Sequence, residues 1–313
     1  MVRHIQGPVE FDCEPDELIV LCVVRNGEYY VRSYIDHYSK LGAKHIVFLL
    51  NDSTDGTLDL LRRHDVTILS TDAPYARYEV VMNHYLMNRF ARDRWSLLAD
   101  IDELFDFPCS HVLSLRDFLR YLNRHRFTAV LTQVLDMFAP GPLGRERVAI
   151  GDDITQLFTH YDLSGITKQQ YTWPGLTNSQ IQWHFGGVRA SIFGTNSSLT
   201  KPALLFFERK LRIFFEVHHV MGARIADVSC LLRHYPFVGR FREKVAEAIA
   251  TRRYSNAKWD YDGYWRILEH DPHPVIGSAA ARNFDGTQSL IEEGFLIVSD
   301  EYRRWVEAHA AHE

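Results

Sequence analysis

The sequence has few cysteines and no long apolar run. The four cysteines among 313 residues stand at positions 13, 22, 109 and 230, without the short paired spacing of a disulfide framework or a zinc knuckle. The longest apolar runs, such as 46–50 and 203–207, fall far short of the roughly 20 residues that cross a bilayer. Residues 1–12 lack the apolar run of a signal peptide. We therefore expect a reducing, cytoplasmic location, with a peripheral position at a membrane left open.

The sequence also lacks an excess of basic residues. It has 35 Lys and Arg against 40 Asp and Glu, which gives a formal net charge of -5 and a pI near 6.3. A nucleic-acid-binding domain normally carries a clearly basic surface, so no nucleic-acid partner is expected. The 46% hydrophobic and 13% aromatic content predicts an ordinary folded protein with a large core.

The first 136 residues alternate between short apolar runs and segments of helical period. Apolar runs predict strands at 18–24, 46–50, 66–69, 96–101 and 127–135, and helical spacing lies between them at 30–41, around 58–61, and at 75–94 and 114–122. Such alternation predicts a doubly wound α/β sheet, mostly parallel, with right-handed crossovers. Ligands of these sheets bind beyond the carboxyl ends of the strands. We expect 1–136 to form a nucleotide-binding half.

The pattern loosens after residue 136. Segments 139–144, 171–178 and 186–198 are rich in turn-forming residues and predict loops over a site. Order returns at 203–217, 228–232 and 241–249, and 300–313 predicts a final amphipathic helix. We expect 137–313 to form an acceptor-side region of strands and helices, packed with the first half as one continuous catalytic domain.

An acidic triplet ends the fourth predicted strand. Asp100, Asp102 and Glu103 follow the apolar run 97–99. Strand alternation would direct Asp100 and Asp102 to one side, where two carboxylates suit a hard divalent cation. Without a cation they would repel each other and raise each other's pKa. The alternative is that these acids only cap or solvate the end of the strand.

Two polar turns follow the first and second predicted strands. Arg25, Asn26 and Glu28 lie where the first strand opens towards a helix, and a base or phosphate could bind there to backbone amides. The segment 51–57 could place Asp52 against a base or ribose hydroxyls. Either segment alone also suits an ordinary capped turn.

Three further residues are candidates for chemistry. His234 follows an apolar run and could give a metal a nitrogen ligand. His218, which stands close to Glu216 and next to His219, suggests an acid/base group, because no third ligand stands at the spacing of a zinc site. Packed or solvated histidines are the alternative in a chain with 16 of them.

Taken in order, the segments 24–30, 51–57 and 99–104 resemble the glycosyltransferase family 2 superfamily, which has the GT-A fold. The sequence Asp-Ile-Asp-Glu at 100–103, followed by Leu104, Phe105 and Phe107, is similar to the branch that includes glycosyltransferase family 92. The likeness covers 18 to about 135. The chain lacks the Gln-x-x-Arg-Trp motif and a clear Glu-Asp pair for the catalytic base.

The resemblance implies a role for each matched position. Asp100, Asp102 and His234 would bind Mn²⁺ or Mg²⁺. The resemblance does not identify the base, for which Glu216 is our own candidate, with His218 as its substitute. The residues that the resemblance implies for binding the nucleotide-sugar donor are Val24, Arg25, Asn26, Glu28, Asp52, Asp100 and Ile101.

The expected function is metal-dependent transfer of a sugar from a nucleotide-sugar donor, as UDP-sugar, to the hydroxyl of a glycan or lipid-linked acceptor, with inversion, in polysaccharide biosynthesis. One alternative is a nucleotidyltransferase, although its usual Gly-rich basic loop is missing. Another is a non-catalytic sugar-binding protein that stacks sugars on tryptophans, and its candidates are Trp173, Trp183, Trp259 and Trp265.

Overall fold

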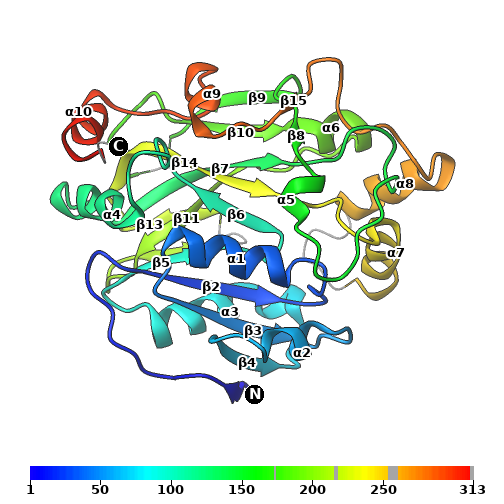
Figure 1. The fold of residues 1–313 in the computed structure, drawn as a ribbon, viewed down its shortest axis with the longest axis horizontal. Coiled ribbons are helices and arrows are strands. Elements are labelled where there is room, and N and C mark those ends of the chain that lie inside the picture. Colours follow the sequence, from blue (N-terminus) through cyan, green and yellow to red (C-terminus); the bar gives the residue numbers. More distant parts are fainter. Residues whose placement is uncertain (173, 215–217, 253–259, 311–313) are drawn as a thin grey trace.

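The protein is an α/β molecule built around one large sheet (Figure 1). The computed structural model describes residues 1–172, 174–214, 218–252 and 260–310. Among these residues, no helix combines the length and the apolar character that a membrane crossing requires.

The central sheet has nine strands in the order β1-β4-β3-β2-β5-β11-β7-β14-β6. Strands β4, β3, β2 and β5 run parallel to one another, whereas β11 is antiparallel to both β5 and β7. β14 runs parallel to β7, and the edge strands β1 and β6 are antiparallel to their neighbours. The strand bounds are β1 Arg3–Gln6, β2 Leu18–Val24, β3 His45–Asn51, β4 Thr67–Thr71, β5 Trp95–Leu98, β6 Glu103–Asp106, β7 Ala129–Asp136, β11 Thr200–Phe206 and β14 Ile225–His234. This confirms the predicted α/β class, with the Rossmann-like order β4-β3-β2-β5 in the parallel part of the sheet.

Three two-stranded sheets accompany the central one. They pair β9 with β10, β12 with β13, and β8 with β15, all antiparallel. Their bounds are β8 His160–Tyr161, β9 Ile166–Gln170, β10 Gln182–Gly186, β12 Arg212–Phe214, β13 His219–Met221 and β15 Arg282–Asn283. They all belong to the second half of the chain.

Helices cover both faces of the sheet. Their bounds are α1 Val31–Leu41, α2 Thr57–Leu61, α3 Tyr75–Phe90, α4 Leu115–Arg124, α5 Ile154–Leu157, α6 Gly187–Phe193, α7 Phe241–Thr251, α8 Asp262–His270, α9 Thr287–Glu292 and α10 Asp300–His309. Helices α7 and α8 lie at the edge of the molecule towards which the arrow of β2 points (Figure 1). They belong to the end of the sheet where ligands bind in such folds.

Strand β2 shows how the sequence builds two cores. All seven of its residues are buried, and successive side chains point to opposite faces. Val20 and Cys22 pack with Tyr34 of α1, whereas Ile19 and Leu21 belong to the core of α3. A strand covered on both faces therefore appears as a continuous apolar run.

Several predicted elements are confirmed and others are corrected. The first strand has its predicted bounds, and Ser114 caps α4 through the backbone N–H of Asp117, as expected. The segment 186–198 is not a plain loop, since α6 lies within it. Strand β5 ends at Leu98 rather than at 101, because residues 99–102 form a turn that leads into β6.

Candidate functional site

A cavity of about 700 Å³ opens at the carboxyl ends of β2, β3 and β5. Its walls also include residues of α6, β11, β14, α7 and α8. Asp52, which was predicted to bind the donor, does not line the cavity. Neither do Trp183 and Trp265, two of the tryptophans considered for sugar stacking. Glu216, Trp173 and Trp259 lie outside the described residues. The predicted site residues that line the cavity are Val24, Arg25, Asn26, Glu28, Asp100, Ile101, Asp102, His218 and His234.

The two polar turns are bound to each other. The Asn26 side-chain oxygen accepts the backbone N–H of Thr54 at 2.8 Å, and a Glu28 carboxylate oxygen accepts that of Gly56 at 3.0 Å. Asn26 has φ 51°, a left-handed conformation that asparagine tolerates better than most residues. The polar residues of both turns thus fix one rigid edge of the cavity.

Arg25 joins this edge to α7. Its guanidinium lies 3.0 Å from an Asp52 carboxylate oxygen and 2.7 Å from one of Glu247. Burial opposes the charge, but Glu247 and Asp52 raise the pKa of Arg25. Asp52 therefore acts on the cavity through Arg25.

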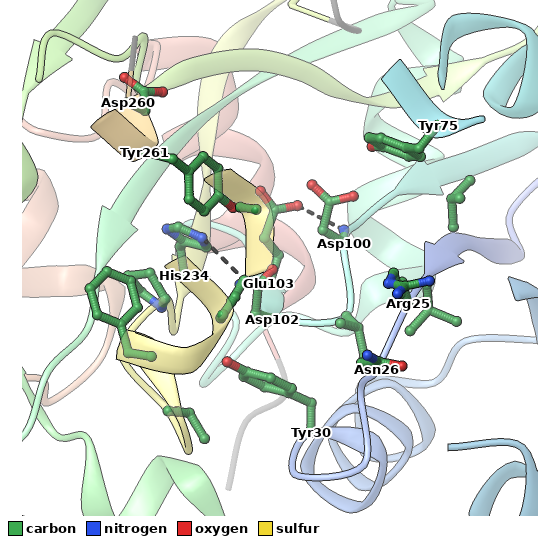
Figure 2. A pocket seen from close by; sticks show the side chains of 18 of the residues that line it. Arg25, Asn26, Tyr30, Tyr75, Asp100, Asp102, Glu103, His234, Asp260 and Tyr261 are labelled. Carbon is green, nitrogen blue, oxygen red and sulfur yellow. Dashed lines mark hydrogen bonds and ion pairs between the residues drawn. The ribbon is translucent and has the colours of Figure 1, made fainter. Parts of the chain in front are cut away.

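Asp100 and Asp102 belong to the turn between β5 and β6, and Glu103 is the first residue of β6, so alternation along a single strand does not set the directions of the two aspartates. The Asp100 side chain is 56% exposed, whereas that of Asp102 is 12% exposed. Both nevertheless line the cavity (Figure 2). Glu103 accepts the backbone N–H of Asp100 at 2.9 Å, and Lys201 Nζ lies 2.5 Å from the same Glu103 oxygen. This buried pair fixes the turn that carries Asp100.

Lys201 also approaches Asp100, at 3.6 Å between Nζ and a carboxylate oxygen. Burial works against its charge, but Glu103 and Asp100 keep the pKa of Lys201 above its ordinary value. The turn therefore contains a permanent positive charge beside its acids.

His234, at the end of β14, connects two carboxylates. Its Nδ1 lies 2.6 Å from Asp136 Oδ1, and its Nε2 lies 3.7 Å from Asp102 Oδ2. Asp136, at the end of β7, also forms an ion pair with Arg189, with 2.8 Å between Asp136 Oδ2 and Arg189 Nε. Although burial opposes protonation, Asp102 and Asp136 raise the pKa of His234 to about 9. Asp136 thus orients the ring so that Nε2 faces Asp102.

Asp102 has a second partner, Lys244 of α7, whose Nζ lies 3.4 Å from the same Oδ2. Burial would raise the pKa of Asp102, but Lys244 and His234 overcome it and lower that pKa. Asp102 is therefore held as a carboxylate.

The candidate ligand atoms are of the kinds that bind Mn²⁺ or Mg²⁺, although the structure does not bring them to one point. Within the described ranges, no group of three His, Cys, Asp or Glu residues is arranged to hold a metal ion. Asp100 and Asp102 offer the oxygen ligands that such cations prefer, and His234 bonds to Asp136 in the way that orients metal-binding histidines. These three residues are the ones that would hold a cation here.

His218 lies on another wall of the cavity. Its Nδ1 is 3.0 Å from the carbonyl oxygen of Thr200. A carbonyl only accepts, so Nδ1 donates and the lone pair of the neutral ring lies on Nε2. This tautomer suits a proton acceptor.

The sequence prediction missed other charged residues of the cavity region. Asp136 ends an apolar run as Asp100 does, and that signal could have identified it. Lys201 and Lys244 had no such signal, because their roles depend on where β11 and α7 pack. The missed residues are Asp136, Arg189, Lys201, Lys244 and Glu247.

No protein-family model and no curated protein matches the sequence. Among solved structures, residues 1–349 of S. aureus TarS match with 14% identity and a TM-score of 0.31, over 42% of this chain and 38% of that one. A longer TarS structure gives the same identity and TM-score over 23% of its length. A nucleotidyl transferase from Methanothermobacter thermautotroptrophicus matches with 11% identity and a TM-score of 0.24, over 40% of this chain and 63% of that one. At these TM-scores the matches carry no argument about activity, which must come from the cavity.

Proposed function

We propose that this chain is a glycosyltransferase that moves a sugar from a nucleotide-sugar donor to an acceptor hydroxyl. One observation carries the proposal: the two linked polar turns, the Asp100–Asp102 turn and His234 converge on a single cavity at the carboxyl ends of the strands. This is the place where a doubly wound sheet binds nucleotides.

The donor is proposed to extend across the cavity floor. Its nucleoside would lie at the edge formed by Arg25, Asn26 and Glu28, and its diphosphate would lie towards Asp100 and Asp102. A divalent cation held by these two aspartates and His234 would neutralise the charge of the diphosphate. A UDP-sugar is the donor we propose, on the family resemblance.

The chain's own residues would supply the proton transfer. The acceptor oxygen attacks the anomeric carbon, the bond from that carbon to the phosphate oxygen breaks, and the nucleoside diphosphate leaves. Nε2 of His218 takes the proton of the acceptor hydroxyl, and Glu216 remains the other candidate base. A single displacement of this kind inverts the anomeric centre.

The acceptor is proposed to be a glycan or a lipid-linked sugar. Tyr261 lines the cavity at the start of α8, and an aromatic ring offers a flat face on which a sugar ring can pack. Family resemblance is the basis for proposing polysaccharide synthesis in the cytoplasm, at or near a membrane surface.

The test is donor hydrolysis with and without Mn²⁺. UDP-sugars incubated with the protein and Mn²⁺ should release UDP, and Asp102→Asn should lower the rate by at least about 100-fold, because a bound cation contributes several kcal/mol to charge stabilisation. Asp59→Asn, on α2 and away from the cavity, is the matched control.

Other outcomes would replace the proposal. Formation of a nucleotide-sugar from a nucleoside triphosphate and a sugar phosphate would make the protein a nucleotidyltransferase. Tight binding of sugars without any turnover would make it a binding protein.

A further inference from the structure

Lys244 holds a place beside Asp102 that it cannot keep once a cation binds there. Its Nζ lies 3.4 Å from Asp102 Oδ2, the oxygen that His234 Nε2 also approaches at 3.7 Å. An imidazole nitrogen can become a ligand of the cation, but an ammonium group has no lone pair to offer. A cation at Asp102 would therefore retain His234 and repel Lys244.

The other buried cations of the cavity region are held more tightly. Arg25 lies 2.7 Å from Glu247, Arg189 lies 2.8 Å from Asp136, and Lys201 lies 2.5 Å from Glu103. None of these three carboxylates belongs to the predicted ligand set. Lys201 also lies 3.6 Å from the predicted ligand Asp100, but Glu103 anchors it at 2.5 Å and its side chain is only 6% exposed. Lys244 lies 3.4 Å from the predicted ligand Asp102, and its side chain is 36% exposed. Of these four cations, Lys244 is therefore the one that we expect a bound metal ion to displace.

The released side chain remains at the cavity. Lys244 and Glu247 stand three residues apart on α7, so they share a face, and both line the cavity. The Glu247–Arg25 ion pair links this face to the turn after β2. A lysine on a flexible four-carbon stem is a common point-charge ligand of phosphate.

We propose that Lys244 is an exchangeable counterion: it neutralises Asp102 in the empty site, and it binds the diphosphate of the donor when a cation takes its place. This rests on the proposed function, in which a nucleoside diphosphate and a divalent cation share the cavity. It makes Lys244 a specificity residue for the phosphate groups of the donor.

The proposal predicts effects of opposite sign in one variant. In Lys244→Met, Mn²⁺ alone should bind about 3- to 10-fold more tightly, because the competing ammonium group is gone. UDP in the presence of saturating Mn²⁺ should bind at least about 10-fold more weakly, because a charge-assisted contact with phosphate is lost. Isothermal titration calorimetry measures both constants without turnover.

Two further variants make the result decisive. Lys244→Arg keeps the charge and should keep UDP affinity within about 3-fold, without tighter Mn²⁺ binding. Lys40→Met, an exposed lysine of α1 outside the cavity, should change neither constant.

The outcomes separate this proposal from the one on which it rests. If the unaltered protein binds neither Mn²⁺ nor UDP, the proposed function fails. If it binds both, but Lys244→Met weakens both or leaves both unchanged, the exchange is wrong while the function stands.

Discussion

At the scale of single residues, three buried ion pairs lie beside the cavity. They join Arg189 to Asp136, Lys201 to Glu103, and His234 to Asp136. Removing a charge from water costs several kcal/mol, so a buried ion persists only beside a compensating partner. The pairs add little net stability by that reasoning. They fix the directions of the groups that face the cavity.

The tautomer of His218 leads to a kinetic prediction. His218→Gln should lower kcat by about 10²- to 10⁴-fold, the usual contribution of a general base, and should leave the donor KM nearly unchanged. Its neighbour His219, which does not line the cavity, supplies the control His219→Gln. A variant with kcat close to that of the unaltered protein would assign the proton transfer to another group, and Glu216→Gln would then be the next variant to assay.

At the element scale, the turn 99–102 is the feature that matters most. It joins β5, in the parallel half of the sheet, to β6 at the far edge. The carbonyl of Asp102 accepts the backbone N–H of Tyr235 at 2.8 Å, just after β14, and Tyr34 of α1 donates to the carbonyl of Ala99 at 3.0 Å. The aspartates thus stand on a turn that two other elements hold.

Helix α4 gives a stability prediction at the same scale. Ser114 is its N-cap, and its side-chain oxygen accepts the backbone N–H of Asp117 at 3.1 Å. Ser114→Ala should cost about 1 kcal/mol of the free energy of unfolding, the usual value of an N-cap, which lowers Tm by about 2 °C in a protein of this size.

The matched control for the cap is Ser39→Ala, at an exposed helical position of α1. Differential scanning calorimetry should show no loss of Tm for this variant. Equal losses in both variants would mean that the Ser114 hydroxyl does not act as a cap.

For the whole molecule, the half-buried His37 and the buried His184 predict sensitivity to acid. Burial lowers the pKa of His37 from 6.5 to about 4 and that of His184 from 6.5 to about 3. The unfolded chain binds these protons more readily than the folded one. Stability is therefore full above pH 6.5 and falls as the pH drops towards the folded values.

His37→Gln tests this pH dependence. Between pH 7 and 5 each such histidine removes up to about 2 kcal/mol from the free energy of unfolding, since one pKa unit corresponds to about 1.36 kcal/mol. Urea unfolding at pH 7 and at pH 5 measures how much free energy of unfolding is lost between the two pH values. This loss should be smaller in His37→Gln than in the unaltered protein, by about 2 kcal/mol. His270→Gln, an exposed histidine of α8, is the control. The same pH dependence in both variants would contradict the assignment.

The sequence by itself determined the elements of the parallel half and their polar ends. A strand buried on both faces must be a continuous apolar run, as β2 is, and a polar cluster just after such a run must lie at the edge of the sheet. Those local rules are enough to place Arg25, Asn26 and Glu28 at the same edge as the Asp100–Asp102 segment, and all of these residues line the cavity.

The tertiary structure alone decided which distant residues complete the site. Strand β11 enters between β5 and β7 and brings Lys201 to Glu103, 98 positions away in sequence. Helix α7 brings Lys244 to Asp102, 142 positions away. No local pattern specifies such contacts, because they depend on strand order and helix packing across the whole chain. The same reason explains why strand alternation is not what directs Asp100 and Asp102 to the cavity that both line: the chain leaves β5 at Leu98 to reach β6.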